Sequence, residues 1–200
     1  MKLTQIEKIY DPKSFTALID TLLTRFDSPK VFSEDPSVDI ENIAKNVGIN
    51  GIVYAPSEEF YGTHAILEDA VLKINQSDSR AKQIFSIAHE IGHIVLGHID
   101  ITAEYKVARR GISGITELQK RLETENIVRT ALLMEIIYEK TADFFAASLL
   151  VPLSRFLLWE DRPDADIAKA FGVEEKCIKE RRKEVETIMP ELALDTKAAG

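Results

Sequence analysis

Apolar residues recur along most of this chain at the spacing of a helix surface, three or four positions apart. This periodicity predicts helices over the ranges 14–26, 38–46, 79–97, 115–122, 127–150, 154–159 and 166–186, the last being two helices separated by Gly172. The pattern changes only in the first third of the chain. The fold is therefore predicted to be mainly helical.

Three short runs in that first third read as strands rather than helices. They are Ile52–Tyr54, His64–Leu67 and Ala70–Ile74, and the last two are joined by a tight link at Glu68 and Asp69. Neighbouring runs joined by so short a link are typical of a hairpin. We therefore expect a small antiparallel sheet with an exposed edge, packed against the helices.

Composition and charge narrow the classes of protein that fit this pattern. The 200 residues include 45% hydrophobic ones, enough to bury a core without disulfide or metal staples. The net charge of −8 disfavours non-specific binding to nucleic acid. Cys177 is the single cysteine, which excludes an intrachain disulfide and zinc sites built from several thiolates. No signal peptide or membrane-spanning stretch is recognisable, so a soluble, cytoplasmic protein is expected.

The segment most informative about chemistry is His89-Glu90-Ile91-Gly92-His93, an H-E-x-x-H sequence inside a predicted helix. Residues four apart lie on one helix face, so both imidazoles can point at a single metal ion. Glu90 is then placed to reach a water molecule on that ion. The helix is flanked by apolar positions, where unligated histidines would be costly to desolvate. A metal site is therefore favoured over two incidental polar residues.

A catalytic zinc ion needs a third protein ligand and one open position. His98 lies five residues after His93, which does not fit the six-residue spacing of the metzincin pattern. His64 is a second possibility, although a lone strand histidine is more often a surface or groove residue. The third possibility is a carboxylate from the row Glu135, Glu139 and Asp143, spaced four apart on one helix face. Glu135 is expected to face solvent, whereas Glu139 and Asp143 lie where the helix becomes apolar all round.

Two sequence segments resemble motifs of the ImmA/IrrE family of metallo-endopeptidases, a gluzincin-type group. These segments are HEIGHIVLGH and EKTADFFAASLLVP, and the resemblance covers about residues 37–153. It implies one Zn²⁺ ion per chain, with Mn²⁺ as an alternative. It also implies the residues of the site: metal ligands His89, His93 and Glu139, general base Glu90, and Asp143 as hydrogen-bond acceptor of a ligand histidine. The spacing between His93 and Glu139 exceeds the family pattern, so residues 105–124 are interpreted as an insertion or lid.

The resemblance also implies a function, which is endopeptidase cleavage of a helix-turn-helix transcriptional repressor that releases stress or mobile-element genes. Gluzincins commonly add a tyrosine or histidine to the oxyanion, and His64, Tyr105 and Tyr138 are candidates here. The strand Ala70–Ile74 precedes the zinc helix as the edge strand does in zincins, so it is expected to bind an extended peptide by β-augmentation.

Two other function classes remain to be separated from the peptidase. One is a catalytically weak zinc-fold regulator that binds and sequesters a repressor or antitoxin. The other is a deformylase-like hydrolase, which is disfavoured because its cysteine ligand lies upstream of the motif, whereas Cys177 lies downstream.

The expected organisation is an α+β, mainly helical, zincin-like core with helical additions at both ends. The predicted parts are an N-terminal helical segment (1–36), the metallopeptidase core (37–153), a C-terminal helical extension (154–190) and a flexible tail (191–200). The stretch 166–182 has the rhythm of a helix-turn-helix and carries several basic residues. Because its flanks and the whole chain are acidic, we interpret it as a packing or partner-docking pair rather than a DNA-binding one.

Overall fold

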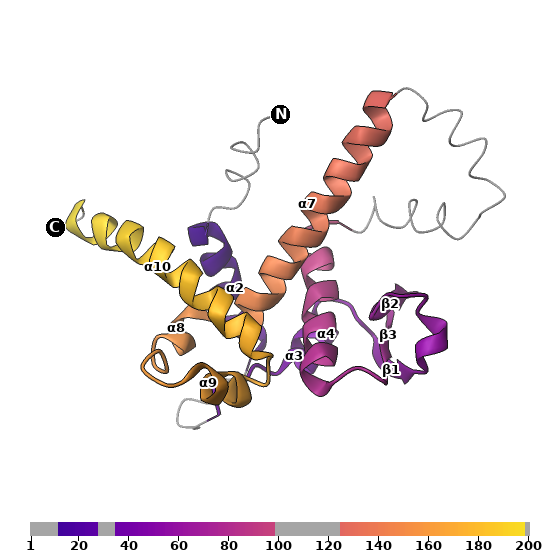
Figure 1. Cartoon of the computed structure of the whole chain (residues 1–200), viewed down its shortest axis with the longest axis horizontal. Coiled ribbons are helices and arrows are strands. Elements are labelled where there is room, and N and C mark those ends of the chain that lie inside the picture. The colour runs from indigo at the N-terminus through magenta and orange to yellow at the C-terminus, as the bar shows by residue number, and fades with distance from the viewer. Residues whose placement is uncertain (1–11, 28–34, 99–124, 199–200) are drawn as a thin grey trace.

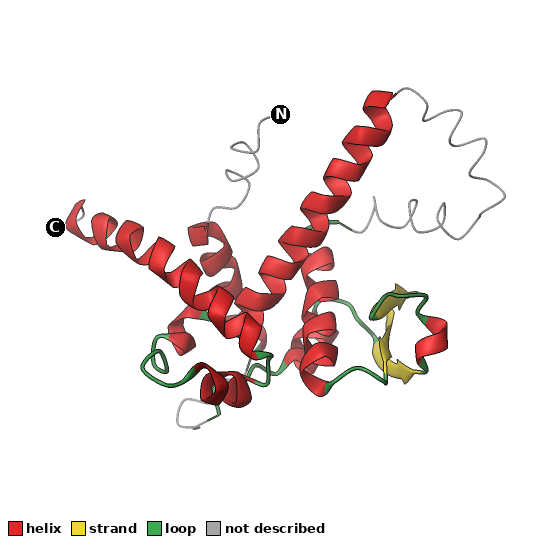
Figure 2. Ribbon diagram, viewed as in Figure 1, coloured by secondary structure: helices red, strands yellow, loops and turns green. Residues whose placement is uncertain are grey.

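The computed structural model of this chain describes residues 12–27, 35–98 and 125–198. Its elements in chain order are α2 (Pro12–Phe26), α3 (Ile40–Asn46), β1 (Gly51–Ala55), the 3₁₀ turn η1 (Ser57–Glu59), β2 (Ala65–Glu68), β3 (Val71–Asn75), α4 (Arg80–Val95), α7 (Glu125–Leu150), α8 (Leu153–Phe156), α9 (Asp164–Phe171) and α10 (Glu175–Ala198) (Figures 1 and 2). No helix in these ranges is both long and apolar enough to cross a membrane.

Most predicted elements are present with small shifts of their bounds. The helix predicted over 115–122 and the lid or insertion predicted over 105–124 lie outside the described residues. α10 continues in helical conformation to Ala198, across most of the stretch for which the sequence predicts a tail.

The sheet is mixed, with strand order β1-β3-β2. β2 and β3 pair antiparallel, as predicted for the hairpin, but β1 and β3 run parallel. The expectation of a purely antiparallel sheet is therefore wrong, and so is the expectation that the strand Ala70–Ile74 forms an edge. β3 is central because β1 pairs with it across the intervening η1 and β2, a non-local pairing that residue alternation does not specify.

The turn between β2 and β3 contains two residues in left-handed conformation. Glu68 pairs with Val71, and between them Asp69 and Ala70 have φ angles of 50° and 61°. Two such residues make a two-residue hairpin loop whose twist matches that of the strands. Asp tolerates this conformation well, whereas alanine carries a steric penalty there. The tight link therefore lies at Asp69 and Ala70, one residue later than predicted.

Helix α4 lies between the sheet and α7 (Figure 1). The helix begins where the Ser79 hydroxyl accepts a hydrogen bond from the backbone N–H of Lys82 at 3.3 Å. Near its C-terminal end, Gly92 lies against α7. A Cβ atom at Gly92 would lie 3.0 Å from Cδ1 of Phe145 and 3.3 Å from the backbone of Ala142. The missing side chain therefore allows the close approach of the two helices.

The C-terminal helices share one hydrophobic core with the rest of the molecule. Ile167, Phe171 and Ile178 are buried in the same cluster as Ile87 of α4 and Phe145 of α7. This packing explains the apolar rhythm that resembles a helix-turn-helix.

Several polar groups of the C-terminal pair contact acidic neighbours. Nε of Arg182 lies 2.6 Å from Asp164, and Nζ of Lys179 lies 2.7 Å from Glu175. The Cys177 thiol is buried, and burial is the main cause that raises its pKa to about 12. The pair is thus built as a packed element of the fold, and whether it also contacts DNA stays an open prediction.

Candidate metal centre

Helices α4 and α7 bring three predicted metal ligands together. The ligand atoms of His89, His93 and Glu139 lie within 4.8 Å of one another. Nε2 of His89 is 3.3 Å from one carboxylate oxygen of Glu139, and Nε2 of His93 is 3.5 Å from the other. The two Nε2 atoms are 2.9 Å apart. Helical i, i+4 spacing places the histidines on one face, and the Gly92 contact sets that face against α7.

The chemistry of this donor set fits a divalent cation. All three atoms carry lone pairs directed at a common point, which is unfavourable unless a proton or a cation lies between them. For a tetrahedral ion with bonds of about 2.0–2.1 Å, ligand atoms are separated by about 3.3 Å. The two Nε2 atoms are 2.9 Å apart, and each lies 3.3 or 3.5 Å from a different oxygen of Glu139, so each of these separations is close to that value. Imidazole and carboxylate ligands suit zinc, but they also suit other divalent metals.

Asp143 orients the first of the ligand histidines. Its Oδ1 lies 2.9 Å from Nδ1 of His89, so Nδ1–H donates to the carboxylate and Nε2 is left for the metal. Burial alone would lower the pKa of His89. The hydrogen bonds to Asp143 and Glu139 and the charge of Glu90 outweigh burial and raise that pKa to about 9. The site thus holds a positive charge strongly at neutral pH.

The predicted general base, Glu90, is only 7% exposed although it carries no metal-ligating role. In contrast to Glu90, Glu139 and Asp143 are exposed to solvent, with 48% and 59% of their side-chain surface accessible. The apolar surroundings predicted for these two residues are therefore absent. The metal cluster is buried on its α4 side and open on its α7 side, which leaves a direction from which a substrate can approach.

His98 and Tyr138 lie beside the cluster without joining it. The His98 ring is buried, 5.2 Å from the His93 ring and 4.2 Å from the Tyr138 ring. Burial lowers the pKa of His98, so its charged form is disfavoured. Glu135, two turns before Asp143 on α7, is half-buried and is not one of the three clustered residues.

The other predicted site residues are placed differently. Nδ1 of His64, the residue before β2, lies 2.9 Å from Asp78, and His64 is not one of the three clustered residues. Tyr105 lies outside the described residues. His64 is half-exposed, so a role at a substrate groove stays a prediction.

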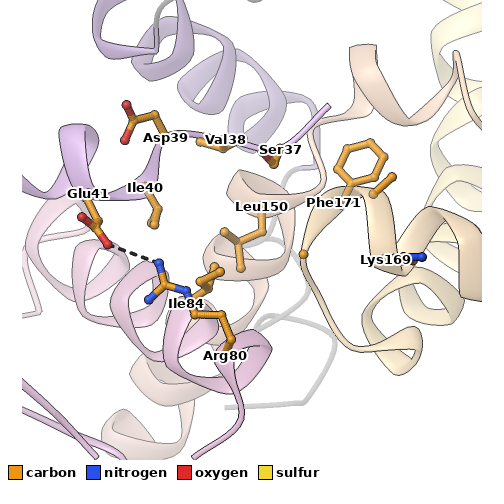
Figure 3. Close-up of a pocket in the computed structure, with 12 residues that line it drawn as sticks. Ser37, Val38, Asp39, Ile40, Glu41, Arg80, Ile84, Leu150, Lys169 and Phe171 are labelled. Carbon is orange, nitrogen blue, oxygen red and sulfur yellow. Dashed lines mark hydrogen bonds and ion pairs between the residues drawn. The ribbon is translucent and has the colours of Figure 1, made fainter. Parts of the chain in front are cut away.

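A pocket of about 360 Å³ opens elsewhere, at the N-terminal end of α4 (Figure 3). Its apolar floor includes Ile84, Leu150 and Phe171, and an ion pair of 3.3 Å between Arg80 and Glu41 lies at its side. None of the predicted site residues lines it. Sequence reasoning missed this pocket, because its walls come from helices that meet only in the folded chain.

Comparison of the sequence with models of known protein families shows to which family this chain belongs. The family model of the IrrE N-terminal-like domain, Peptidase M78, matches residues 44–183. The chain belongs to the Peptidase M78 family. This match bears out the resemblance to ImmA/IrrE proteins, and it extends into the predicted C-terminal extension.

More distant comparisons add little to the assignment to Peptidase M78. No curated protein matches the chain. Among solved structures, a Mycobacterium tuberculosis transcriptional regulator is similar, with a TM-score of 0.49 and 15% identity. The similarity covers 84% of this chain and 46% of that regulator, so this chain spans less than half of the regulator's length.

Proposed function

We propose that this Peptidase M78 member is a zinc-dependent endopeptidase that cleaves one specific protein partner. The observation that carries the proposal is the cluster of His89, His93 and Glu139 with buried Glu90 beside it. Three ligands leave one coordination position for water or substrate. Zn²⁺ bound there would acidify a water molecule and polarise the scissile carbonyl.

The residues of the chain then perform the proton transfers. Glu90 accepts the proton of the attacking water and passes it to the leaving amine. Asp143 keeps the His89 ring in the orientation that the ligand set requires, through the hydrogen bond of 2.9 Å. Of the oxyanion candidates in the described chain, Tyr138 is the better placed, because its ring contacts His98, which in turn contacts the ligand His93. His64 is held by Asp78 before α4 begins.

The open edge for an extended substrate is provided by β2 in this proposal. Two kinds of residue pair alternate along β2: Glu68–Val71 and Ile66–Lys73 are of one kind, and Leu67–Leu72 and Ala65–Ile74 are of the other. In a two-residue hairpin the residues flanking the turn are hydrogen-bonded to each other, so Ala65 and Leu67 direct their backbone groups outward. β2 packs against α4, the helix of the metal ligands. A peptide that adds to β2 therefore runs alongside that helix.

We propose a helix-turn-helix transcriptional repressor as the substrate, whose cleavage relieves repression of stress or mobile-element genes. The net charge of −8 is complementary to a basic DNA-binding protein. The alternative is a regulator that binds and sequesters such a repressor without cleaving it. The two differ in their dependence on Glu90.

The decisive test compares Glu90→Gln with Glu135→Gln, a matched substitution on the other helix of the site. Each purified, zinc-loaded protein is incubated with a candidate helix-turn-helix repressor, with and without chelator, and the products are identified by mass spectrometry. We expect discrete cleavage by wild type and Glu135→Gln, and none by Glu90→Gln or after chelation. Repressor inactivation that persists in Glu90→Gln without cleavage would support sequestration instead.

A further inference from the structure

We infer that His98 is a positioning residue, whose ring holds the imidazole of the metal ligand His93 in place. This inference rests on the proposed metal site. It assigns a role to His98, the last histidine of the segment 89–98, which is not one of the three clustered ligands.

The way in which α4 ends brings His98 back to the site. Gly97, with φ of 72°, follows the helix in left-handed conformation. Its N–H bonds to the carbonyl of Ile94 at 3.2 Å, and the N–H of His98 bonds to the carbonyl of His93 at 2.8 Å. These two bonds are those of a Schellman motif, which reverses the chain at a helix end. The backbone of His98 is thereby fixed to that of the ligand.

The side chains continue this arrangement as a row of rings. The His93 ring meets the His89 ring at 4.7 Å and 65°, and the His98 ring at 5.2 Å and 72°. The His98 ring also packs on the Tyr138 ring of α7, at 4.2 Å and 35°. Such separations are those of packed ring pairs. Tyr138 therefore supports His98, and His98 fills the space into which the His93 ring would otherwise turn.

Because both rings are buried, the contact between His98 and His93 affects metal binding. His93 is 4% exposed and His98 is 6% exposed, so no bulk water surrounds either ring. Removing the His98 ring leaves a void beside a ligand whose orientation decides where its Nε2 points. Loss of a hydrogen-bonded partner that orients a metal-bound histidine typically weakens metal binding by about 10- to 100-fold, and we expect loss of this packing contact to lie at the lower end of that range. Because His98 supplies no ligand atom, the number of ions bound at saturation stays at one.

The test is a titration of the metal-free protein with Co²⁺, read by visible absorption. We expect His98→Ala to bind Co²⁺ about tenfold more weakly than wild type, with an altered visible spectrum and unchanged stoichiometry. His98→Phe keeps a ring of similar shape and restores most of the affinity. Gly97→Ala displaces His98 through the backbone, so it weakens Co²⁺ binding in the same direction.

Gly48→Ala is the matched control for Gly97→Ala. Gly48 also follows a helix with positive φ, 102°, and a Cβ atom at either glycine meets nothing within 4 Å. It lies beyond α3, so its substitution lowers stability without changing Co²⁺ affinity or spectrum. Wild-type affinity and spectrum in His98→Ala would overturn the inference, as would equal weakening by Gly48→Ala. Failure of the wild-type protein to bind Co²⁺ at all would instead overturn the proposed metal site, and the inference with it.

Discussion

Substitution of Gly92 by alanine tests whether close packing of α4 on α7 builds the metal site. The added methyl group would lie 3.0 Å from the Phe145 ring and 3.3 Å from the backbone of Ala142, both fully buried. Overpacking of this kind costs about 1–3 kcal/mol. Alanine regains about 0.5–1 kcal/mol through its higher helix propensity. We therefore expect a net loss of about 0–2.5 kcal/mol in the free energy of unfolding, with about 1 kcal/mol as the central value.

The same change also moves the ligands. If α4 and α7 separate by a few tenths of an ångström, His89 and His93 move away from Glu139, and zinc affinity falls together with stability. Urea unfolding of the metal-free protein measures the first effect, and competition with a chromophoric chelator measures the second. Leu149→Ala is the control. It leaves a cavity in the core that lowers the free energy of unfolding by about 2–5 kcal/mol, and Leu149 lies on α7 at a distance along the helix from the ligands. A free energy of unfolding for Gly92→Ala that equals or exceeds that of wild type would refute the packing argument.

Three further predictions follow from the site and the hairpin. Glu139→Ala lowers the zinc stoichiometry measured by elemental analysis, whereas Glu135→Ala leaves it near one; the reverse pattern would reassign the third ligand. Zinc must displace the proton that His89 binds with a pKa of about 9, so apparent zinc affinity falls about tenfold per pH unit below 9. Protonation of His89 also stabilises the metal-free fold: this stabilisation is complete below pH 6.5 and is lost as the pH rises through 9. A zinc affinity that does not change from pH 7 to 9 would contradict both statements. Ala70→Gly relieves the left-handed φ of 61° and raises the free energy of unfolding by about 0.5–1 kcal/mol in thermal melts, and no gain would mean that the turn is unstrained.

Local sequence patterns predicted the positions of most elements and the likeliest donors because both depend on helical spacing. The imidazoles of His89 and His93 lie on one face for that reason, and the row that contains Glu139 and Asp143 follows the same rule. The capped start of α4 at Ser79 was equally local. Their meeting across two helices was one of three possibilities that the residues left for the third ligand, and the family resemblance favoured it.

Features that depend on distant contacts were not predictable in this way. The parallel pairing of β1 with β3 joins strands that are not neighbours in the chain, and alternation alone does not reveal it. The exposure of Glu139 depends on what packs around α7 rather than on its own helix. Gly97 was a recognisable signal for a helix end, yet the place of His98 depends on Tyr138, which lies far away in the sequence.

The buried thiol of Cys177 gives the protein an intrinsic reporter of its own opening. A thiol with a pKa of about 12 is almost entirely protonated at pH 8, and burial keeps reagents away from it. Because the chain has no other cysteine, alkylation reads out a single position, on the first turn of α10. The rate of labelling therefore measures how often the C-terminal helices detach from the common core, and metal binding or a docked partner can be followed through that rate without any engineered probe.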